Sequence, residues 1–346
     1  MSVQKKDFGK TSKGEVATLY CFTNENQMEM RVSDYGATLV SVLVPDRDEQ
    51  VCDVILGYDS AKEYEDGPTF QGATVGRNGN RIGNAAFSIN GTQYQLDKND
   101  NDNNLHSGLD YFSKRMWKVK SVEDTAITFS LMSPDGDQGY PGNIDIHVTY
   151  TLTKDNEVQI TYEGTPDKDT IMNMTNHSYF NLSGHAAGTI LDQEVWIDAD
   201  KYTDVDAQAI PTGKLNDVTG TPLDFRTAKL IGKEIEADCE ALRLAGGYDH
   251  NWALNKQSGY GKVASMYSAQ SGIHMDVYTD LPGVQLYTGN FITEEVGKNN
   301  VHYVRRQALC FETQYYPDAI NHESFASPVC KAGEKYYTKT AYKFYI

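Results

Sequence analysis

Apolar and polar residues alternate with a period of two along much of the chain. The segment 144–152 has an apolar residue at every second position, and the alternation resumes over 158–162 after the turn "KDN". Alternation of this kind is typical of half-buried strands, so the two segments predict an antiparallel hairpin. Asn90-Gly91 separates two further short alternations and predicts a second hairpin, because this dipeptide suits a two-residue type I′ turn.

Further short strands are predicted over 126–133, 194–199, 283–291 and 341–346, and only 228–245 has a convincing helical pattern. Many short strands without a regular alternation of strands and helices favour an all-β fold of packed antiparallel sheets with few short helices. The chain contains no internal repeat, low-complexity tract or flexible linker, so we expect residues 1–346 to form a single domain.

The segment "IMNMTNHSYFNL", residues 171–182, predicts a strand with two different faces. On one face alternation places polar and aromatic side chains, namely Asn173, Thr175, His177, Tyr179 and Asn181. The other face is apolar, with Met172, Met174, Phe180 and Leu182. A buried polar face needs hydrogen-bond partners or a wet cavity, since each unpaired group costs about 1–3 kcal/mol. We therefore expect this strand to form a wall of a ligand site.

Composition and charge narrow the class of protein. The 346-residue chain has a formal net charge of -17, which repels nucleic acids and anionic membranes. Its amino terminus lacks the apolar core of a signal peptide, and no stretch approaches the roughly 20 apolar residues that span a bilayer. The five cysteines are widely spaced and form no C-x-x-C pair, which predicts reduced packing residues. We expect a soluble cytoplasmic protein with no nucleic-acid or membrane partner.

The motifs of several common enzyme classes are missing. "GRNGNRIG", residues 76–83, has the spacing of neither a dinucleotide fingerprint nor a P-loop. The sequence has no G-x-S-x-G elbow, and its eight histidines form no H-E-x-x-H or similar ligand pattern. These observations disfavour a nucleotide cofactor and give no support for a metal site, so we expect neither.

Polar side chains that suit a sugar are scattered over predicted strand ends and turns. An arginine, two histidines and two carboxylates supply the donors and acceptors that sugar hydroxyls need, and neighbouring aromatic residues suit the apolar face of a sugar ring. The candidates are Asn80, Arg81, His106, His177, Asp249, Gln285 and Glu312. The set predicts a carbohydrate ligand.

The same segments resemble the aldose 1-epimerase (galactose mutarotase) family. "NMTNHSYFNL", residues 173–182, is similar to the family's signature region, and the other blocks follow in the family's order along essentially the whole chain. These blocks are "GRNGNRIGNAAF", "NLHSG", "SPDGDQGYPG", "GYDHNW", "GVQLYTGNF" and "CFETQYYPDAIN". The resemblance implies a large antiparallel β-sandwich, often called a supersandwich, and interconversion of the α and β anomers of free aldohexoses such as galactose and glucose, without a cofactor or an obligate protein partner.

The resemblance also implies roles for individual residues. Glu312 is expected to be the general base and His177 the general acid, while Asn80, Arg81, His106, Asp249 and Gln285 hold the sugar hydroxyls. Opening the ring requires removal of the C1 hydroxyl proton and protonation of the ring oxygen, so one base and one acid suffice. The apolar neighbours Cys310 and Phe311 are expected to raise the pKa of Glu312 by desolvation. One departure from the family pattern is Ser107, where the family has glycine after the histidine.

Other interpretations of these residues remain open at the level of sequence. Arg81 could form an ion pair with a neighbouring aspartate, and Asp249 could cap a turn after Gly246-Gly247. Gln285 could be a strand residue without a role in the site. His250 and His322 are taken as structural. A glycoside hydrolase with Asp249 and Glu312 as paired carboxylates, a sugar sensor or lectin, and an epimerase for hexose 6-phosphates are the alternative functions.

Overall fold

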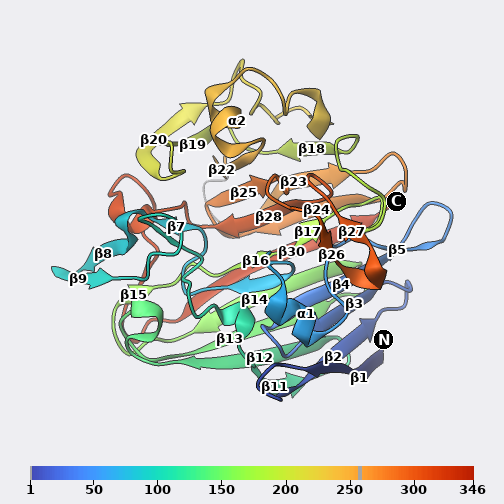
Figure 1. The fold of residues 1–346 in the computed structure, drawn as a ribbon, viewed down its shortest axis with the longest axis horizontal. Coiled ribbons are helices and arrows are strands. Elements are labelled where there is room, and N and C mark those ends of the chain that lie inside the picture. Colours follow the sequence, from blue (N-terminus) through green and yellow to red (C-terminus); the bar gives the residue numbers. More distant parts are fainter. Residues whose placement is uncertain (1, 256–258) are drawn as a thin grey trace.

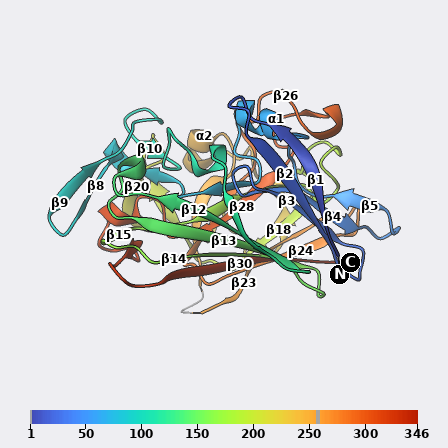
Figure 2. The same cartoon turned by 90° about the horizontal axis from the view of Figure 1, so that it is seen from below.

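A computed structural model describes residues 2–255 and 259–346, and β-strands dominate it (Figure 1). Within these residues the two α-helices are short, α1 (Ala61–Asp66) and α2 (Glu240–Ala245). The two chain ends lie on the same side of the molecule (Figures 1 and 2). The expected all-β class with few short helices is confirmed.

Three larger sheets carry most of the strands. The N-terminal sheet has five strands in sequence order, β1 (Ser2–Lys10), β2 (Val16–Thr23), β3 (Glu29–Ser33), β4 (Thr38–Pro45) and β5 (Val51–Asp53). The nine-stranded sheet has the order β11 (Lys118–Val122), β12 (Ala126–Ser133), β13 (Ile144–Leu152), β14 (Glu157–Gly164), β30 (Tyr336–Tyr345), β24 (His274–Thr279), β23 (Gly261–Tyr267), β18 (Glu194–Ile197) and β21 (Lys229–Leu230). The six-stranded sheet has the order β17 (Tyr179–Phe180), β28 (Leu309–Gln314), β25 (Gly283–Tyr287), β22 (Asp249–Ala253), β19 (Lys201–Val205) and β20 (Pro211–Asp217).

Short strand pairs connect these sheets. They are β6 (Ala73–Val75) with β16 (Thr175–His177), β7 (Arg81–Ile82) with β10 (Asn104–Leu105), β8 (Ala86–Ile89) with β9 (Thr92–Gln95), β15 (Thr170–Ile171) with β29 (Val329–Cys330), and β26 (Glu295–Val296) with β27 (His302–Tyr303). All five pairs are antiparallel.

The main hydrophobic core takes buried side chains from all three of these sheets, among them Val32 of β3, Val148 of β13 and Leu286 of β25. Tyr342 of β30 reaches across this core, where its ring centroid lies 4.7 Å from that of Phe180 and its hydroxyl donates to the Phe311 carbonyl at 3.0 Å. The C-terminal strand β30 runs between β14 and β24, so the end of the chain completes the middle of the larger sheet (Figure 2). This packing of antiparallel sheets is the expected sandwich.

Both predicted hairpins are present. β13 and β14 pair antiparallel, and β8 and β9 pair on either side of Asn90-Gly91. Asn90 and Gly91 have φ values of 51° and 78°, as a type I′ turn requires at both central positions.

The helix predicted over 228–245 is wrong in most of its length. The segment contains β21, the 3₁₀ turn Ile231–Lys233 and the six-residue helix α2, which begins after Cys239 without a side-chain cap. A Cβ atom at Gly232 would lie 2.7 Å from the Leu191 carbonyl oxygen, so this backbone packs closely against another segment. Tertiary packing therefore overrides the helical pattern here.

The strand predicted over 171–182 is divided between several partners. β15 pairs with β29, β16 with β6, and β17 with β28. The side-chain amide of Asn173 donates a hydrogen bond to the Tyr315 carbonyl at 3.4 Å. The side-chain amide of Asn181 donates to the Gln307 carbonyl at 2.7 Å. Only part of the expected polar face is therefore left for a ligand.

β28 brings its alternating side chains to two different environments. Phe311 faces the core, where its backbone meets Tyr342, whereas Cys310 and Glu312 lie on the opposite face. Phe311 therefore does not flank the Glu312 carboxyl, contrary to our expectation, whereas Cys310 lies on the same face of β28 as Glu312.

None of the helices in the described part of the chain has the length and apolar character needed to cross a lipid bilayer.

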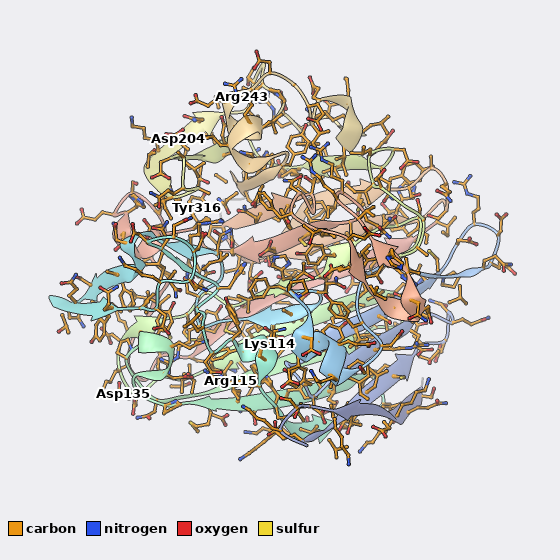
Figure 3. The ribbon with its side chains drawn as sticks, viewed as in Figure 1. Lys114, Arg115, Asp135, Asp204, Arg243 and Tyr316 are labelled. Atoms are coloured by element: carbon orange, nitrogen blue, oxygen red, sulfur yellow. The ribbon has the colours of Figure 1, made fainter. Side chains whose placement is uncertain are left out.

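Lys114, labelled in Figure 3, fixes the end of α1 by donating to the carbonyls of Tyr64 at 2.5 Å, Glu65 at 3.2 Å and Gly67 at 3.0 Å. This contact anchors the chain just before it enters the wall of a cavity.

Candidate active site

A cavity of about 250 Å³ lies over the face of the six-stranded sheet that is opposite the core. Strands of this sheet contribute to its floor, among them β28 with Glu312, β25 with Tyr287 and β22 with Asp249. The remaining lining residues are Pro68, Thr69, Phe70, Asn80, Arg81, Leu105, His106, His177, Tyr179, Phe291 and Thr293. Six of the seven sequence-predicted site residues thus meet in one cavity, and the seventh, Gln285, lies outside its lining.

Glu312 is the buried carboxyl at the floor of this cavity. The residue is 2% exposed, and its Oε2 atom has no hydrogen-bond partner among the described residues. Burial, and then the negative charge of Asp249, raise the pKa of Glu312 well above its ordinary value, while Arg81 opposes the shift. A carboxyl with a raised pKa and a free oxygen is a suitable proton acceptor.

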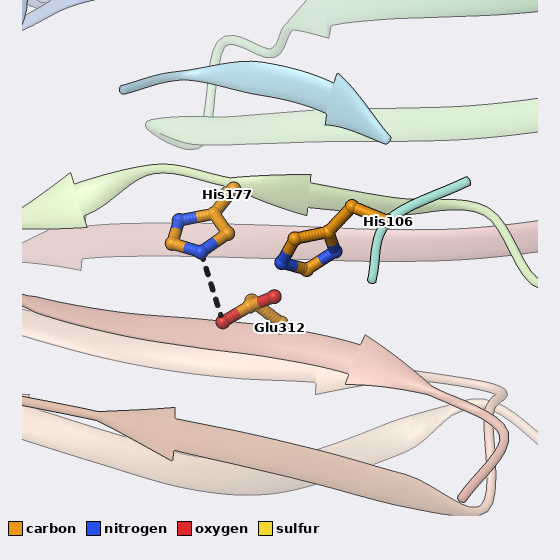
Figure 4. Close-up of side chains that lie close together, drawn as sticks. All are labelled: His106, His177 and Glu312. Atoms are coloured by element: carbon orange, nitrogen blue, oxygen red, sulfur yellow. Dashed lines mark ion pairs between the residues drawn. The ribbon is translucent and has the colours of Figure 1, made fainter. Parts of the chain in front are cut away.

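His177 faces Glu312 from β16. Its Nε2 atom lies 3.5 Å from Glu312 Oε1, and both side chains are almost fully buried (Figure 4). On the other side of the ring, Nδ1 lies 3.3 Å from the Cys310 sulfur. Burial lowers the pKa of His177 to about 4, and a backbone hydrogen bond opposes that shift. The pair places an imidazole and a carboxyl, two groups that can exchange protons, side by side in a buried site.

His106 lies beside the other two side chains of Figure 4 and is held by Asn80. The Asn80 backbone N–H donates to His106 Nδ1 at 3.1 Å, and the His106 N–H donates to the Asn80 carbonyl at 3.0 Å. Because Nδ1 accepts, the neutral ring carries its hydrogen on Nε2. Burial, then the charges of His177 and Arg81, lower the pKa of His106 well below its ordinary value. His106 is therefore a neutral hydrogen-bond donor.

The same three side chains are the candidate ligands for a metal ion. One ligand atom from each of His106, His177 and Glu312 lies within 4.8 Å of the others. Two histidines and a carboxylate would suit zinc. The hydrogen bond from Asn80 to His106 disfavours this use, because Nδ1 is occupied and Nε2 carries a hydrogen in the neutral ring. The donor set fits a sugar hydroxyl better than a metal ion.

Ser107 occupies a backbone conformation that favours glycine. Its φ is 58°, and that of His106 is 54°. The Ser107 hydroxyl accepts from the Asn78 N–H at 2.9 Å, donates to the Asn78 carbonyl at 3.0 Å and lies 3.0 Å from the Tyr140 hydroxyl. These contacts offset the strained backbone, so the departure from the family pattern leaves His106 in the cavity wall.

Arg81 contacts both the cavity and a carboxylate. Its Nε donates to Asp100 Oδ2 at 2.7 Å. This pairing is the structural interpretation that the sequence left open, yet Arg81 also lines the cavity. Asp100 was not singled out from the sequence, where nothing distinguishes it within the run "DKNDND".

Asp249 lines the cavity with Gln285 behind it. Gln285 Nε2 donates to Asp249 Oδ1 at 2.6 Å, and Gln285 in turn accepts from Gln314 at 3.3 Å. Burial raises the pKa of Asp249, which Arg81 and the Gln285 hydrogen bond lower. Gln285 contacts the cavity only through Asp249.

Aromatic side chains complete the wall, and the sequence identified few of them. The ring of Phe70 lies 4.8 Å from that of His106 and 5.7 Å from that of His177. Tyr287 lies 6.1 Å from His177 and stacks on Phe291 at 6.3 Å. Phe70 lies in an irregular segment without periodicity, so no sequence pattern could have found it.

The two histidines interpreted as structural are outside the lining of this cavity. His250 Nδ1 accepts from the Asp249 N–H at 3.1 Å, and its ring packs at 6.1 Å from that of Trp252. His322 Nε2 lies 3.2 Å from Asp318 Oδ2. Their interpretation as structural agrees with these contacts.

The fold and the cavity define a class of protein, a β-sandwich with a buried pair of histidine and glutamate and several sugar-compatible groups. Comparison with known proteins narrows this class. The family model described as aldose 1-epimerase matches residues 18–343. The chain belongs to the aldose 1-epimerase family.

Characterised relatives are similar along the full length. An aldose 1-epimerase of Escherichia coli is 38% identical over 334 residues, which cover 96% of each chain. A galactose mutarotase of Bos taurus is 36% identical over 347 residues and covers 100% of this chain and 99% of its own. Among solved structures, an aldose epimerase homologue from C. elegans has a TM-score of 0.88 at 29% identity, covering 95% of this chain and 99% of its own. A galactose 1-epimerase from Lactobacillus acidophilus has a TM-score of 0.87 at 28% identity, covering 100% of this chain and 99% of its own.

The family relationship establishes the type of activity. The chain is an isomerase-type enzyme that interconverts the anomers of sugars. The resemblance seen in the sequence, the supersandwich fold and the enzyme class are therefore confirmed.

Proposed function

We propose that this enzyme interconverts the α and β anomers of free aldohexoses such as galactose and glucose, with Glu312 as the base and His177 as the acid. The observation that carries this proposal is the buried pair itself, with 3.5 Å between His177 Nε2 and Glu312 Oε1. The names of the mutarotase relatives support galactose as a substrate.

The chemistry needs two proton transfers. Glu312 removes the proton of the C1 hydroxyl, a carbonyl forms at C1, and the bond between C1 and the ring oxygen breaks. The ring oxygen takes the electron pair of that bond and a proton from His177. The open aldehyde rotates about the C1–C2 bond, and the reverse transfers close the ring on the other face. Each positioned proton-transfer group is typically worth about 10²–10⁴ in rate.

For this reaction Glu312 and His177 must together carry one titratable proton. Burial favours the neutral forms of both groups, because it raises the pKa of Glu312 and lowers that of His177. A sugar reverses this preference, since its C1 hydroxyl donates to a carboxylate and its ring oxygen accepts from an imidazolium. Substrate binding thus selects the imidazolium and carboxylate form that the reaction requires.

The remaining cavity residues hold the sugar. Arg81 and the Nε2–H of His106 donate to hydroxyl oxygens, Asp249 accepts from hydroxyls, and Asn80 and Gln285 act by fixing His106 and Asp249. The volume of about 250 Å³ is below the roughly 300–1,000 Å³ of pockets for drug-sized ligands, which suits a single sugar ring.

A hexose 6-phosphate fits this cavity less well. Arg81 is the one lysine or arginine among its described lining residues, and it is already paired with Asp100. A phosphate dianion needs more positive charge than this. We therefore propose the neutral sugar as the substrate.

Saturation transfer between the H1 resonances of α- and β-galactose at equilibrium tests the proposal. We expect the wild type to accelerate exchange between the anomers, and Glu312→Ala and His177→Asn to lower the rate by about 10²–10⁴. A parallel assay with nitrophenyl galactoside tests the glycoside hydrolase. Release of nitrophenol without anomer exchange would contradict the proposal, as would a folded Glu312→Ala variant with the wild-type rate.

A further inference from the structure

Glu295 ties together two walls of the cavity without lining it. Its carboxylate accepts hydrogen bonds from Tyr58 at 2.8 Å, Gln71 at 2.7 Å and Thr69 at 3.2 Å. One wall contains Thr69 and Phe70, and the other contains Thr293, two residues before Glu295. The carboxylate therefore fastens the two wall segments to each other.

The donors to Glu295 are all uncharged groups. Among the described residues, no lysine, arginine or histidine forms an ion pair with it. Burial raises the pKa of Glu295, and the three hydrogen bonds lower it. A partly buried carboxylate with three donors at 2.7–3.2 Å is held in one geometry, since each bond to a charged group contributes more than one between neutral groups.

Phe70 is the residue that the hydrogen bonds of Glu295 hold against His106 and His177. It directly follows Thr69 and precedes Gln71, both of which are bound to Glu295. Its ring packs on His106 at 4.8 Å and on His177 at 5.7 Å. On the preceding side, Lys114 fixes the end of α1, so the segment between these anchors has little freedom.

We propose that Glu295 is a positioning residue, which holds Phe70 against the rings of His106 and His177 by binding Thr69 and Gln71. This inference rests on the proposed function of His177 and deepens it. Loss of the Glu295 carboxylate releases the segment 69–71, the Phe70 ring moves off the histidines, and the orientation of the acid is no longer fixed.

The neighbouring glutamate provides a matched control. The side chain of Glu294 is 77% exposed and lies 3.5 Å from that of His302, away from the lining of the cavity. Substitution of Glu294 removes the same charge from the same segment without touching Thr69 or Gln71. Differences between the Glu295 and Glu294 variants therefore report the loss of the hydrogen bonds to Thr69 and Gln71 rather than the loss of a local charge.

The first test compares the kinetics of galactose mutarotation. We expect Glu295→Ala to lower kcat by about tenfold with KM changed less than about threefold, because a displaced acid slows the chemistry more than it weakens binding. Glu295→Gln keeps an acceptor oxygen and should retain most of kcat, and Glu294→Ala should match the wild type. Wild-type kcat in Glu295→Ala would overturn the proposal.

A double substitution identifies Phe70 as the intermediary. If Glu295 acts through Phe70, the variant Phe70→Ala should lose kcat to a similar extent, and Phe70→Ala combined with Glu295→Ala should be no slower than the slower single variant. Losses that multiply would overturn the proposal. If Glu295→Ala does not fold, Thr69→Val, which removes one of the three donors, replaces it in the same comparison.

A spectroscopic measurement separates this inference from the proposed function. The ring protons of His106 and His177 feel the ring current of Phe70, so their NMR resonances should move in Glu295→Ala in the same direction as in Phe70→Ala and stay in place in Glu294→Ala. Unmoved resonances in Glu295→Ala would contradict the positioning role. Moved resonances in a protein without anomer exchange would instead contradict only the proposed function.

Discussion

Glu312 and His177 show how one physical cause shifts the pKa values of two side chains in opposite directions. Burial raises the pKa of the carboxyl and lowers that of the imidazole, so it favours the uncharged form of both groups. The cause is the shared cavity, and Phe70 and Tyr287 belong to the walls that exclude water. The sequence predicted the direction of the Glu312 shift, but not the lowered pKa of His177 or the aromatic residues of the cavity wall, because those rings come from distant segments.

Removal of the Glu312 charge should stabilise the protein while it abolishes turnover. The folded pKa of Glu312 is raised above its unfolded value of about 4.5, so ionisation favours the unfolded chain and stability falls as the pH rises from 4.5 through the folded pKa. At pH above this window Glu312→Gln should be more stable than the wild type by on the order of 1 kcal/mol in urea unfolding. Lower stability of the variant, relative to a Glu294→Gln control, would contradict this account.

His250 should give the opposite dependence on pH. Burial lowers its pKa to about 4, so below pH 6.5 the unfolded chain binds a proton that the folded chain does not, and folded stability is lost as the pH falls from 6.5 to about 4. The stability of the wild type relative to His250→Gln should therefore decrease by up to about 3 kcal/mol over this range. Urea unfolding at a series of pH values measures it, with the exposed His302→Gln as control, and a constant difference would contradict it.

Some strands of the fold can be predicted from the local alternation of apolar and polar residues, and others cannot. β12, β13 and β14 have one buried and one more exposed face, and their alternation predicted them well. β28 and the segment 171–182 are buried on both faces, so alternation there could not show which side chains meet the cavity. The helix predicted over 228–245 failed because apolar residues in its first half, among them Ile231 and Ile235, enter the core from a 3₁₀ turn and a turn rather than from an α-helix.

Site residues were predictable to the extent that chemistry identifies them. Glu312, His177 and three of the sugar-binding candidates carry ionisable groups within recognisable blocks, and they do line one cavity. Phe70, Asp100 and Glu295 act through three-dimensional contacts with Thr69, Arg81 and other partners, for which the sequence has no spacing signal.

The loop that carries His106 gives a prediction for Ser107. Both Ser107→Gly and Ser107→Ala lose the hydrogen bonds to Asn78 and Tyr140, but only alanine keeps a Cβ atom at a φ of 58°. Thermal and urea unfolding should therefore rank wild type above Ser107→Gly and Ser107→Gly above Ser107→Ala, the last two differing by about 1 kcal/mol. Equal stability of the two variants would show that the backbone here is not strained.

The whole molecule combines a rigid β-sandwich with a strong negative charge. Neighbouring strands of the six-stranded antiparallel sheet carry Glu312, Tyr287 and Asp249, while the segments that carry Phe70 and His106 complete the lining of the cavity. The formal charge of -17 repels anionic ligands over a distance that salt shortens. The scaffold thus favours a neutral substrate before any contact is made.

Salt dependence tests this preference. The KM for galactose should change little between about 20 mM and about 0.5 M salt, because a neutral sugar does not respond to the field of the protein. The KM for galactose 6-phosphate should be much higher at low salt and should fall as salt is added. A lower KM for the phosphate at low salt would contradict a neutral substrate.

Polarimetry on freshly dissolved α-D-galactose tests the central claim, that Glu312 and His177 interconvert anomers as a base and acid pair. The rotation should reach equilibrium faster with the wild type and with Glu294→Gln than in buffer alone. Glu312→Ala and His177→Asn, folded by circular dichroism, should each lose about 10²–10⁴ of the catalysed rate. A wild-type rate in either of these two variants would contradict the assignment of the pair, and a wild type that leaves the rotation at the rate of buffer would contradict the account as a whole.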